Sequence, residues 1–182
     1  MAHAKLSPTQ RRLVRELDEI AVLLRMNYRE IEDYEPEERL TRLKLARDHL
    51  VRGEIVMSYT LVDEFLNAIL CAHFFGRKRS HMELWKTKRF KNFNYFLLER
   101  LSLMEKLAYV RAIREVPKPI RSNIEKLNSL RNGVAHAFFP ENLRSAKPTW
   151  KGLDVFSLKG MRQLADDLAE IDKYLTRRAF GV

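Results

Sequence analysis

The sequence has little cysteine, no long apolar run and no secretory leader pattern. Its one cysteine, Cys71, lies inside an apolar stretch, so no disulfide can form within the chain and a reducing compartment is the natural environment. The first ten residues, MAHAKLSPTQ, contain no apolar segment of the kind that a signal peptide needs. No run approaches the roughly 18 continuous apolar residues of a membrane span. We therefore expect a soluble, cytoplasmic protein with no membrane contact.

Motifs of several enzyme classes are also missing. The chain has neither a G-x-S-x-G sequence nor a glycine-rich phosphate loop, and nothing near Cys71 predicts an activated thiol. These absences argue against a nucleophilic hydrolase. His49, His73 and His81 show none of the usual metal-ligand spacings, and His73 is interpreted as a core or edge histidine. We expect no metal and no cofactor. The candidate carboxylate pairs are Asp63-Glu64 and Asp166-Asp167.

The chain does have an excess of positive charge. Lysine and arginine number 34 against 24 acidic residues, which gives a net charge of +10 at pH 7. Such a balance favours a polyanionic partner, chiefly RNA or another nucleic acid. Many basic soluble proteins have no such partner, so charge alone leaves both interpretations open.

Apolar residues recur at helical spacing along most of the chain, which predicts an all-α fold. A hydrophobic content of 46% over 182 residues is enough for a core without disulfides or metal. We predict a helical bundle of about five to seven helices, with a small hairpin-like or irregular insert near residues 148–157. Residues 1–182 are expected to form a single domain, with an N-terminal helical extension at 1–35 and a core bundle at 36–178.

Glycine, proline and serine suggest where helices begin and end. Pro36 opens a helix, Gly53 is a candidate break in it, and Gly76 is expected to end the apolar helix that follows. Helical periodicity resumes from Phe93 to about Glu115, with Ser102 as a candidate new N-cap. The expected core positions of three of the helices are Leu40, Leu43, Ala46 and Leu50; Leu127, Leu130 and Val134; and Met161, Leu164, Leu168, Ile171 and Leu175.

Residues 77–92, RKRSHMELWKTKRFKN, carry seven lysines and arginines against the single acid Glu83. Trp85 and Phe90 are interleaved with these cations, which is typical of segments that stack bases and neutralise phosphates. The alternative is a solvated connection whose aromatic rings fill the bundle. On the first interpretation the RNA-binding residues are Arg77, Lys78, Arg79, Lys86, Lys88, Arg89 and Lys91.

The stretch LNSLRNGVAHAFFP, residues 127–140, places an arginine, an amide and a histidine near a helix end. Residues four apart share a helix face, so Asn132 and His136 lie together, whereas Arg131 lies about 140° around the helix from His136. The three could converge on one ligand if the helix loosens near Gly133 or frays at His136. The alternative is an ordinary helix end, where cations are favoured by the dipole.

The RNGVAH sequence at residues 131–136, preceded by LNSL and followed by an aromatic residue, resembles the R-x(4–6)-H signature of HEPN domains. The YTLVDEFLNAIL stretch is similar to the apolar helix that packs beside the motif in that family. The resemblance implies a small, usually dimeric helical bundle with metal-independent endoribonuclease activity, in a toxin or a phage-defence component. It implies Arg131, His136 and Asn132 as catalytic residues, and an antitoxin protein as a possible partner.

The implied chemistry suits these side chains. Histidine titrates near neutrality and can move the protons of the 2′-hydroxyl or the 5′-oxygen, while arginine can brace the charge on the phosphoryl oxygens. One histidine cannot serve as both acid and base, so a two-fold homodimer with a composite site is expected. Glu64 is a candidate supporting acid paired with Arg131, or else part of a solvated stripe. A non-catalytic helical module that binds RNA, nucleotide or a protein partner is the alternative function.

Overall fold

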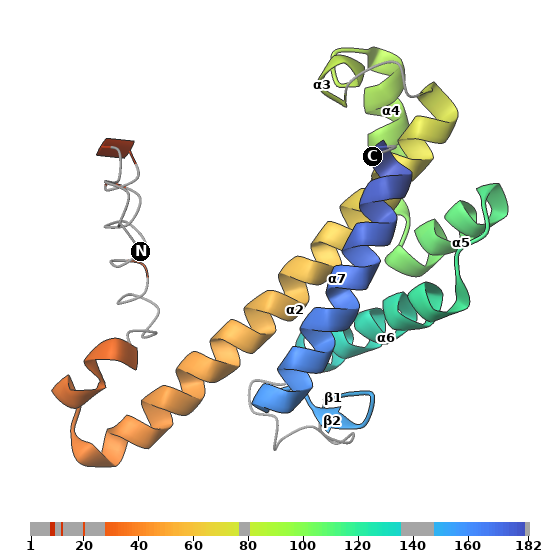
Figure 1. Cartoon of the computed structure of the whole chain (residues 1–182). Coiled ribbons are helices and arrows are strands. Elements are labelled where there is room, and N and C mark those ends of the chain that lie inside the picture. The colour runs from red at the N-terminus through yellow and green to blue at the C-terminus, as the bar shows by residue number, and fades with distance from the viewer. Residues whose placement is uncertain are drawn as a thin grey trace. The chain divides into compact units, whose positions relative to one another are not determined.

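The structure is a computed structural model that describes residues 28–76, 81–135 and 148–180, together with the single positions 8, 9, 12 and 20. Helices dominate these residues, so the predicted all-α fold is confirmed (Figure 1). Two of the helices, η1 and η2, are short 3₁₀ helices. The helices are η1 (Tyr28–Asp33), α2 (Pro36–Phe75), α3 (His81–Leu84), α4 (Lys88–Phe96), η2 (Leu98–Arg100), α5 (Leu103–Ile113), α6 (Lys118–Ala135) and α7 (Leu158–Phe180).

The chain forms two compact units, Met1–Arg52 and Gly53–Val182, which divide inside α2. This division lies further along the chain than residue 36, where the core bundle was expected to start. The single-domain prediction itself stays a prediction.

Helix α2 runs for 40 residues, and the expected break at Gly53 is wrong. A glycine inside a helix costs about 1 kcal/mol relative to alanine, which the hydrogen bonds of the surrounding turns outweigh. The helix ends at Phe75, followed by Gly76 with a φ of +77°, so the predicted stop at Gly76 is confirmed. Glycine adopts this left-handed conformation without the clash that a Cβ would cause.

The N-terminal part of α2 exposes three of its four expected core residues. Ala46 is buried, but Leu40, Leu43 and Leu50 are 62%, 42% and 51% exposed. Helical periodicity identifies an apolar face, but it does not tell whether anything covers that face. Within the described residues, α2 is also the helix long and apolar enough to cross a membrane, a property that the core helices of soluble proteins share.

The second unit is built around α6 and α7, which pack on each other through apolar stripes. Helix α6 buries Ile120, Ile124, Leu127, Leu130 and Val134, as the three- and four-residue spacing requires. The expected anchoring of the motif helix by its last three apolar residues is therefore confirmed. Helix α7 buries its own stripe through Leu164, Ile171 and Leu175.

A two-stranded hairpin precedes α7, as predicted for residues 148–157 (Figure 1). Strands β1 (Thr149–Trp150) and β2 (Leu153–Asp154) pair antiparallel. Lys151 and Gly152 join them with φ values of +49° and +81°, the pattern of a type I′ turn. The hairpin approaches α7 so closely that a Cβ at Gly160 would collide with the backbone carbonyl of Asp154.

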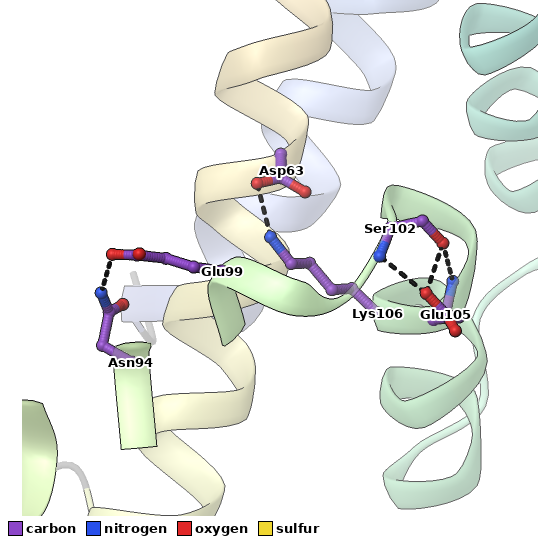
Figure 2. Close-up of polar contacts among 6 residues, drawn as sticks. All are labelled: Asp63, Asn94, Glu99, Ser102, Glu105 and Lys106. Atoms are coloured by element: carbon purple, nitrogen blue, oxygen red, sulfur yellow. Dashed lines mark hydrogen bonds and ion pairs between the residues drawn. The ribbon is translucent and has the colours of Figure 1, made fainter. Parts of the chain in front are cut away.

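The helix expected from Phe93 to Glu115 is interrupted, and the candidate N-cap at Ser102 is confirmed. Helix α4 ends at Phe96, and α5 starts after Ser102. The Ser102 hydroxyl accepts from the Glu105 backbone N–H at 3.3 Å, and the Glu105 carboxylate accepts from the Ser102 N–H at 2.7 Å (Figure 2). This reciprocal pair satisfies two backbone N–H donors at the start of α5. In an uninterrupted helix these donors would bond to the preceding turn.

Asp63 of α2 and Lys106 of α5 form an ion pair that ties the two helices together (Figure 2). Lys106 Nζ donates to an Asp63 carboxylate oxygen at 2.6 Å, and the lysine side chain is 4% exposed. Asp63 is 23% exposed. Asp63, one acid of the first candidate carboxylate pair, is therefore paired with the buried Lys106.

Candidate functional site

Arg131 and Asn132 lie in the last two turns of α6, at the edge of its buried stripe. Leu127, Leu130 and Val134 hold this end of the helix in the core of the second unit. Arg131 is half-buried and Asn132 is exposed. The sequence therefore places the arginine where core and solvent meet, which limits its freedom while leaving the neighbouring amide accessible.

The Arg131 guanidinium lies over the ring of Tyr59 in α2, 5.2 Å from its centroid. This cation–π contact holds the guanidinium in place, and no ion pair with a described residue neutralises its charge. Arg131 Nη1 also donates to Asn132 Oδ1 at 3.2 Å. Among the described residues, the buried Arg131 Nε has no hydrogen-bond partner. The result is a cation held beside an exposed amide. The buried Nε is not available to a ligand, but the Nη groups keep donors for which no acceptor lies among the described residues.

His136 lies outside the described residues, as do the residues that follow it up to 147. Helix α6 continues through Gly133 to Ala135, so a loosening at Gly133, one of the two ways in which the three side chains could converge, is absent from the described part of the helix. A Cβ added to Gly133 would meet no atom within 4 Å. The backbone of α6 up to Ala135 keeps Arg131 about 100° around the helix from Asn132, and only the arginine side chain reaches the Asn132 amide.

Glu64 lies on the solvated side of α2. It is exposed, and none of the ion pairs among the described residues joins it to Arg131. The solvated-stripe interpretation fits its position. Burial, followed by the nearby charge of Glu64, raises the pKa of the Cys71 thiol to about 11. A thiol with such a pKa is inert, which agrees with the expectation that it is no nucleophile.

The second candidate carboxylate pair also has a structural role. Asp167 is buried and accepts from Trp150 Nε1 at 2.6 Å and Lys151 Nζ at 2.7 Å. Burial by itself raises the pKa of Asp167, but the hydrogen bonds from Lys151, Trp150 and Gln163 and the charge of Lys151 give a net lowering from 3.8. The carboxylate thus holds the hairpin on α7. Among the described residues no group of three or more histidine, cysteine or acidic side chains is placed to hold a metal ion.

The basic segment is partly helical. Lys86, Lys88, Arg89 and Lys91 are described and exposed, and three of them belong to α4, whereas Arg77, Lys78 and Arg79 lie outside the described residues. Phe90 is 1% exposed and meets the rings of Phe75 and Trp85 edge-on, so this aromatic residue fills the core. The segment therefore combines both interpretations: its cations face solvent, while one of its aromatic residues packs inside.

Arg131 and the basic segment are far apart within one chain. Arg131 lies over Tyr59, and Arg89 lies over Phe75, both in α2. Sixteen residues at 1.5 Å each separate those rings along the helix, a distance of about 24 Å. The fold of one protomer does not bring them into a single small site.

A cavity of about 450 Å³ lies between α2, α5 and α7, and sequence reasoning did not predict it. Its polar lining residues are His73, Arg114, Tyr174 and Arg178. Each of the three basic residues lies at or next to the C-terminal end of its helix. Cations at those positions are explained by the partial negative charge of the helix ends, so the lining has a structural reason that involves no ligand. His73 is exposed and contacts the ring of Phe74, as an edge histidine does.

Comparison with known proteins adds no further assignment. No protein-family model, curated protein or solved structure matches this chain.

Proposed function

We propose that the protein is a metal-independent endoribonuclease of the HEPN type, with a composite site formed by Arg131, Asn132 and His136 of two protomers. The observation that carries this proposal is the Arg131 guanidinium, held over Tyr59 with an exposed amide beside it. Among the described residues the Nη groups have Asn132 Oδ1 as their hydrogen-bond partner, so they keep further donors for an anion. His136 follows four positions after Asn132 in the sequence. A toxin or phage-defence role, with an antitoxin partner, follows from the family resemblance.

The reaction needs two proton transfers and one charge stabiliser. A neutral His136 takes the proton of the ribose 2′-hydroxyl as its oxygen attacks the adjacent phosphorus. The P–O5′ bond then breaks, and the protonated His136 of the second protomer gives its proton to the leaving 5′-oxygen. Arg131 stabilises the negative charge on the phosphoryl oxygens through Nη donors that have no acceptor among the described residues. The products are a 2′,3′-cyclic phosphate and a 5′-hydroxyl.

The geometry of α2 restricts which dimer could form the composite site. Val56 and Met57 are 40% and 67% exposed. At about 100° per residue, Val56 lies about 60° around α2 from Tyr59, whereas Met57 lies about 160° from it. A two-fold contact along the Val56 edge keeps both copies of Arg131 near the interface. A contact centred on Met57 would hold them on opposite sides of the two helices.

Cleavage in EDTA tests the chemistry. Wild-type protein, Arg131→Ala and His136→Ala are incubated with single-stranded RNA, and the fragment ends are identified by mass spectrometry. Arg111→Ala is the matched control, because Arg111 is an exposed arginine of α5 away from the motif. We expect wild type and control to leave 2′,3′-cyclic phosphates, and both motif variants to lose at least a hundredfold in rate. Cleavage that persists in both motif variants would remove the site assignment, and RNA bound but uncut by wild type would favour the non-catalytic module.

Paired charge insertions test the dimer. Val56→Glu is expected to yield monomers in light scattering and to abolish cleavage, because it buries a carboxylate in the proposed contact. Met57→Glu adds the same charge one residue away and should leave both properties unchanged. The reverse pattern, with dissociation by Met57→Glu alone, would refute the composite geometry.

A further inference from the structure

The exposed side of α4 alternates cations with aromatic rings. On a helical projection, one arc of about 160° contains every exposed residue of this helix, and the opposite side contains the buried Phe90 and Asn94. The residues of the exposed arc other than Asn92, together with Arg100 of η2, are named the α4 platform: Lys88, Arg89, Lys91, Tyr95, Phe96 and Arg100.

The aromatic residues of the α4 platform are not core residues. Tyr95 is 57% exposed and Phe96 is 67% exposed, although both belong to a helix whose other side is well packed. The Arg100 guanidinium lies 6.0 Å from the Phe96 ring centroid, which holds a cation at the edge of this exposed ring. Two large exposed rings, one of them with a cation at its edge, form a surface on which flat groups can stack.

The cations of the α4 platform are placed against local helix preferences. Lys88, Arg89 and Lys91 occupy three of the first four positions of α4, and that turn has no acidic residue. The N-terminal end of a helix carries partial positive charge, so cations there are destabilising and also repel one another. None of the three forms an ion pair with any described residue. Arg89 lies over the Phe75 ring, but no acid among the described residues offsets the three charges. Such a break with local helix preference is expected where an external anion supplies the missing negative charge.

We propose that the α4 platform binds single-stranded RNA, with bases stacked on Tyr95 and Phe96 and phosphates beside Lys88, Arg89 and Lys91. Single strands fit this surface because their bases are open for stacking, and the backbone supplies regularly spaced negative charge. The inference rests on the proposed function for the identity of the polymer. It adds a docking surface about 24 Å along α2 from Arg131, so one strand could contact both places only as an extended segment of several nucleotides.

Fluorescence anisotropy with a labelled 12-nucleotide oligouridine, measured on the full-length His136→Ala protein, tests the platform without cleavage. Tyr95→Ala/Phe96→Ala is expected to weaken binding about tenfold to a hundredfold. Tyr109→Ala is the control, because Tyr109 is 51% exposed on α5, outside the platform. Loss of affinity equal in the control, or no loss in the double variant, would overturn the proposal. Thermal unfolding confirms that the variants fold.

Salt dependence tests the phosphate contacts separately. Lys88→Ala/Lys91→Ala should reduce the slope of log affinity against log salt by about 1.4, because each lost phosphate contact on a single strand removes about 0.7. Arg111→Ala/Lys159→Ala removes the same charge from exposed positions on α5 and α7 and should leave the slope within error of the parent. Equal slopes for the two double variants would refute the contacts.

Two further comparisons separate this proposal from its alternatives and from the cleavage reaction. Preferred binding of the protein to anionic phospholipid vesicles, with no affinity for oligouridine, would overturn RNA as the occupant. Binding at the α4 platform by a wild-type protein that cuts no RNA would support the platform and refute the proposed function. If Tyr95→Ala/Phe96→Ala changes neither the cleavage rate nor the affinity for oligouridine, the platform is refuted and the proposed function is supported.

Discussion

Asp167 is expected to be one of the strongest polar determinants of stability in the second unit. It accepts from the indole of Trp150, which is 1% exposed, and from the ammonium of Lys151, whose side chain is 40% exposed. Asp167→Ala leaves the buried indole N–H without an acceptor, at a cost of about 1–3 kcal/mol. The more exposed Lys151 pair adds up to about 1 kcal/mol, which gives about 1–4 kcal/mol in total.

Urea unfolding at pH 7 measures this loss as a change in midpoint at constant slope. Trp150→Phe and the double variant complete a mutant cycle, in which the shared hydrogen bond should appear as a coupling free energy of about 1–2 kcal/mol. Asp166→Ala is the matched control, because Asp166 is exposed and forms no ion pair with a described residue. A loss below about 0.5 kcal/mol for Asp167→Ala would refute the reasoning, since that is the range of neutral surface changes.

The pH dependence of this contribution follows from the lowered pKa of Asp167. Burial raises that pKa, but the donors around the carboxylate reverse the effect, so the folded value lies below 3.8. A carboxyl whose pKa is lower in the folded state stabilises the protein above its unfolded pKa, and this stability is lost as pH falls through the folded pKa. The difference in unfolding free energy between wild type and Asp167→Asn should therefore be largest near pH 7 and shrink below about pH 4. A difference that grows on acidification would show that the sign is wrong.

Three other predictions concern packing and charge in the same unit. Gly160→Ala should destabilise the protein by about 1–3 kcal/mol in urea unfolding, because the new Cβ would meet the Asp154 carbonyl. Gly53→Ala has open space around it and should stabilise the protein by about 0.5–1 kcal/mol. An unchanged stability of Gly160→Ala would contradict the close approach of the hairpin to α7. Cys71, with a buried thiol and a pKa of about 11, should react with a thiol reagent at pH 8 only after unfolding; rapid reaction of the native protein would argue against its burial. Asp63→Asn should cost about 3 kcal/mol of stability, because it leaves the buried Lys106 ammonium unpaired. Lys106→Met should cost only about 1 kcal/mol, because water can reach the Asp63 carboxylate that remains. The opposite order of the two losses in thermal unfolding would refute this reasoning.

Local sequence determined much of the fold. Leucines and isoleucines at three- and four-residue steps predicted the buried stripes of α6 and α7, because a helix repeats its faces every 3.6 residues. Ser102 predicted a helix start, and the alternation around Gly152 predicted the hairpin, because both depend on hydrogen bonds within a few residues. The same arithmetic predicts that Asn132 and His136 share one helix face. It left an ordinary helix end as the alternative, and the resemblance to HEPN domains is what made the RNGVAH segment a candidate site.

Tertiary structure decided what covers each face. The period that correctly marked Leu127 as core also marked Leu40, which is exposed, since periodicity carries no information about a partner surface. For Phe90 the sequence left open whether it stacks bases or fills the bundle; it is buried against Phe75, while Tyr95 and Phe96 are exposed. Arg131 finds Tyr59, a residue 72 positions earlier in the chain, and not Glu64. Contacts over such separations depend on how helices pack in three dimensions, and the spacing of residues along one helix does not encode them.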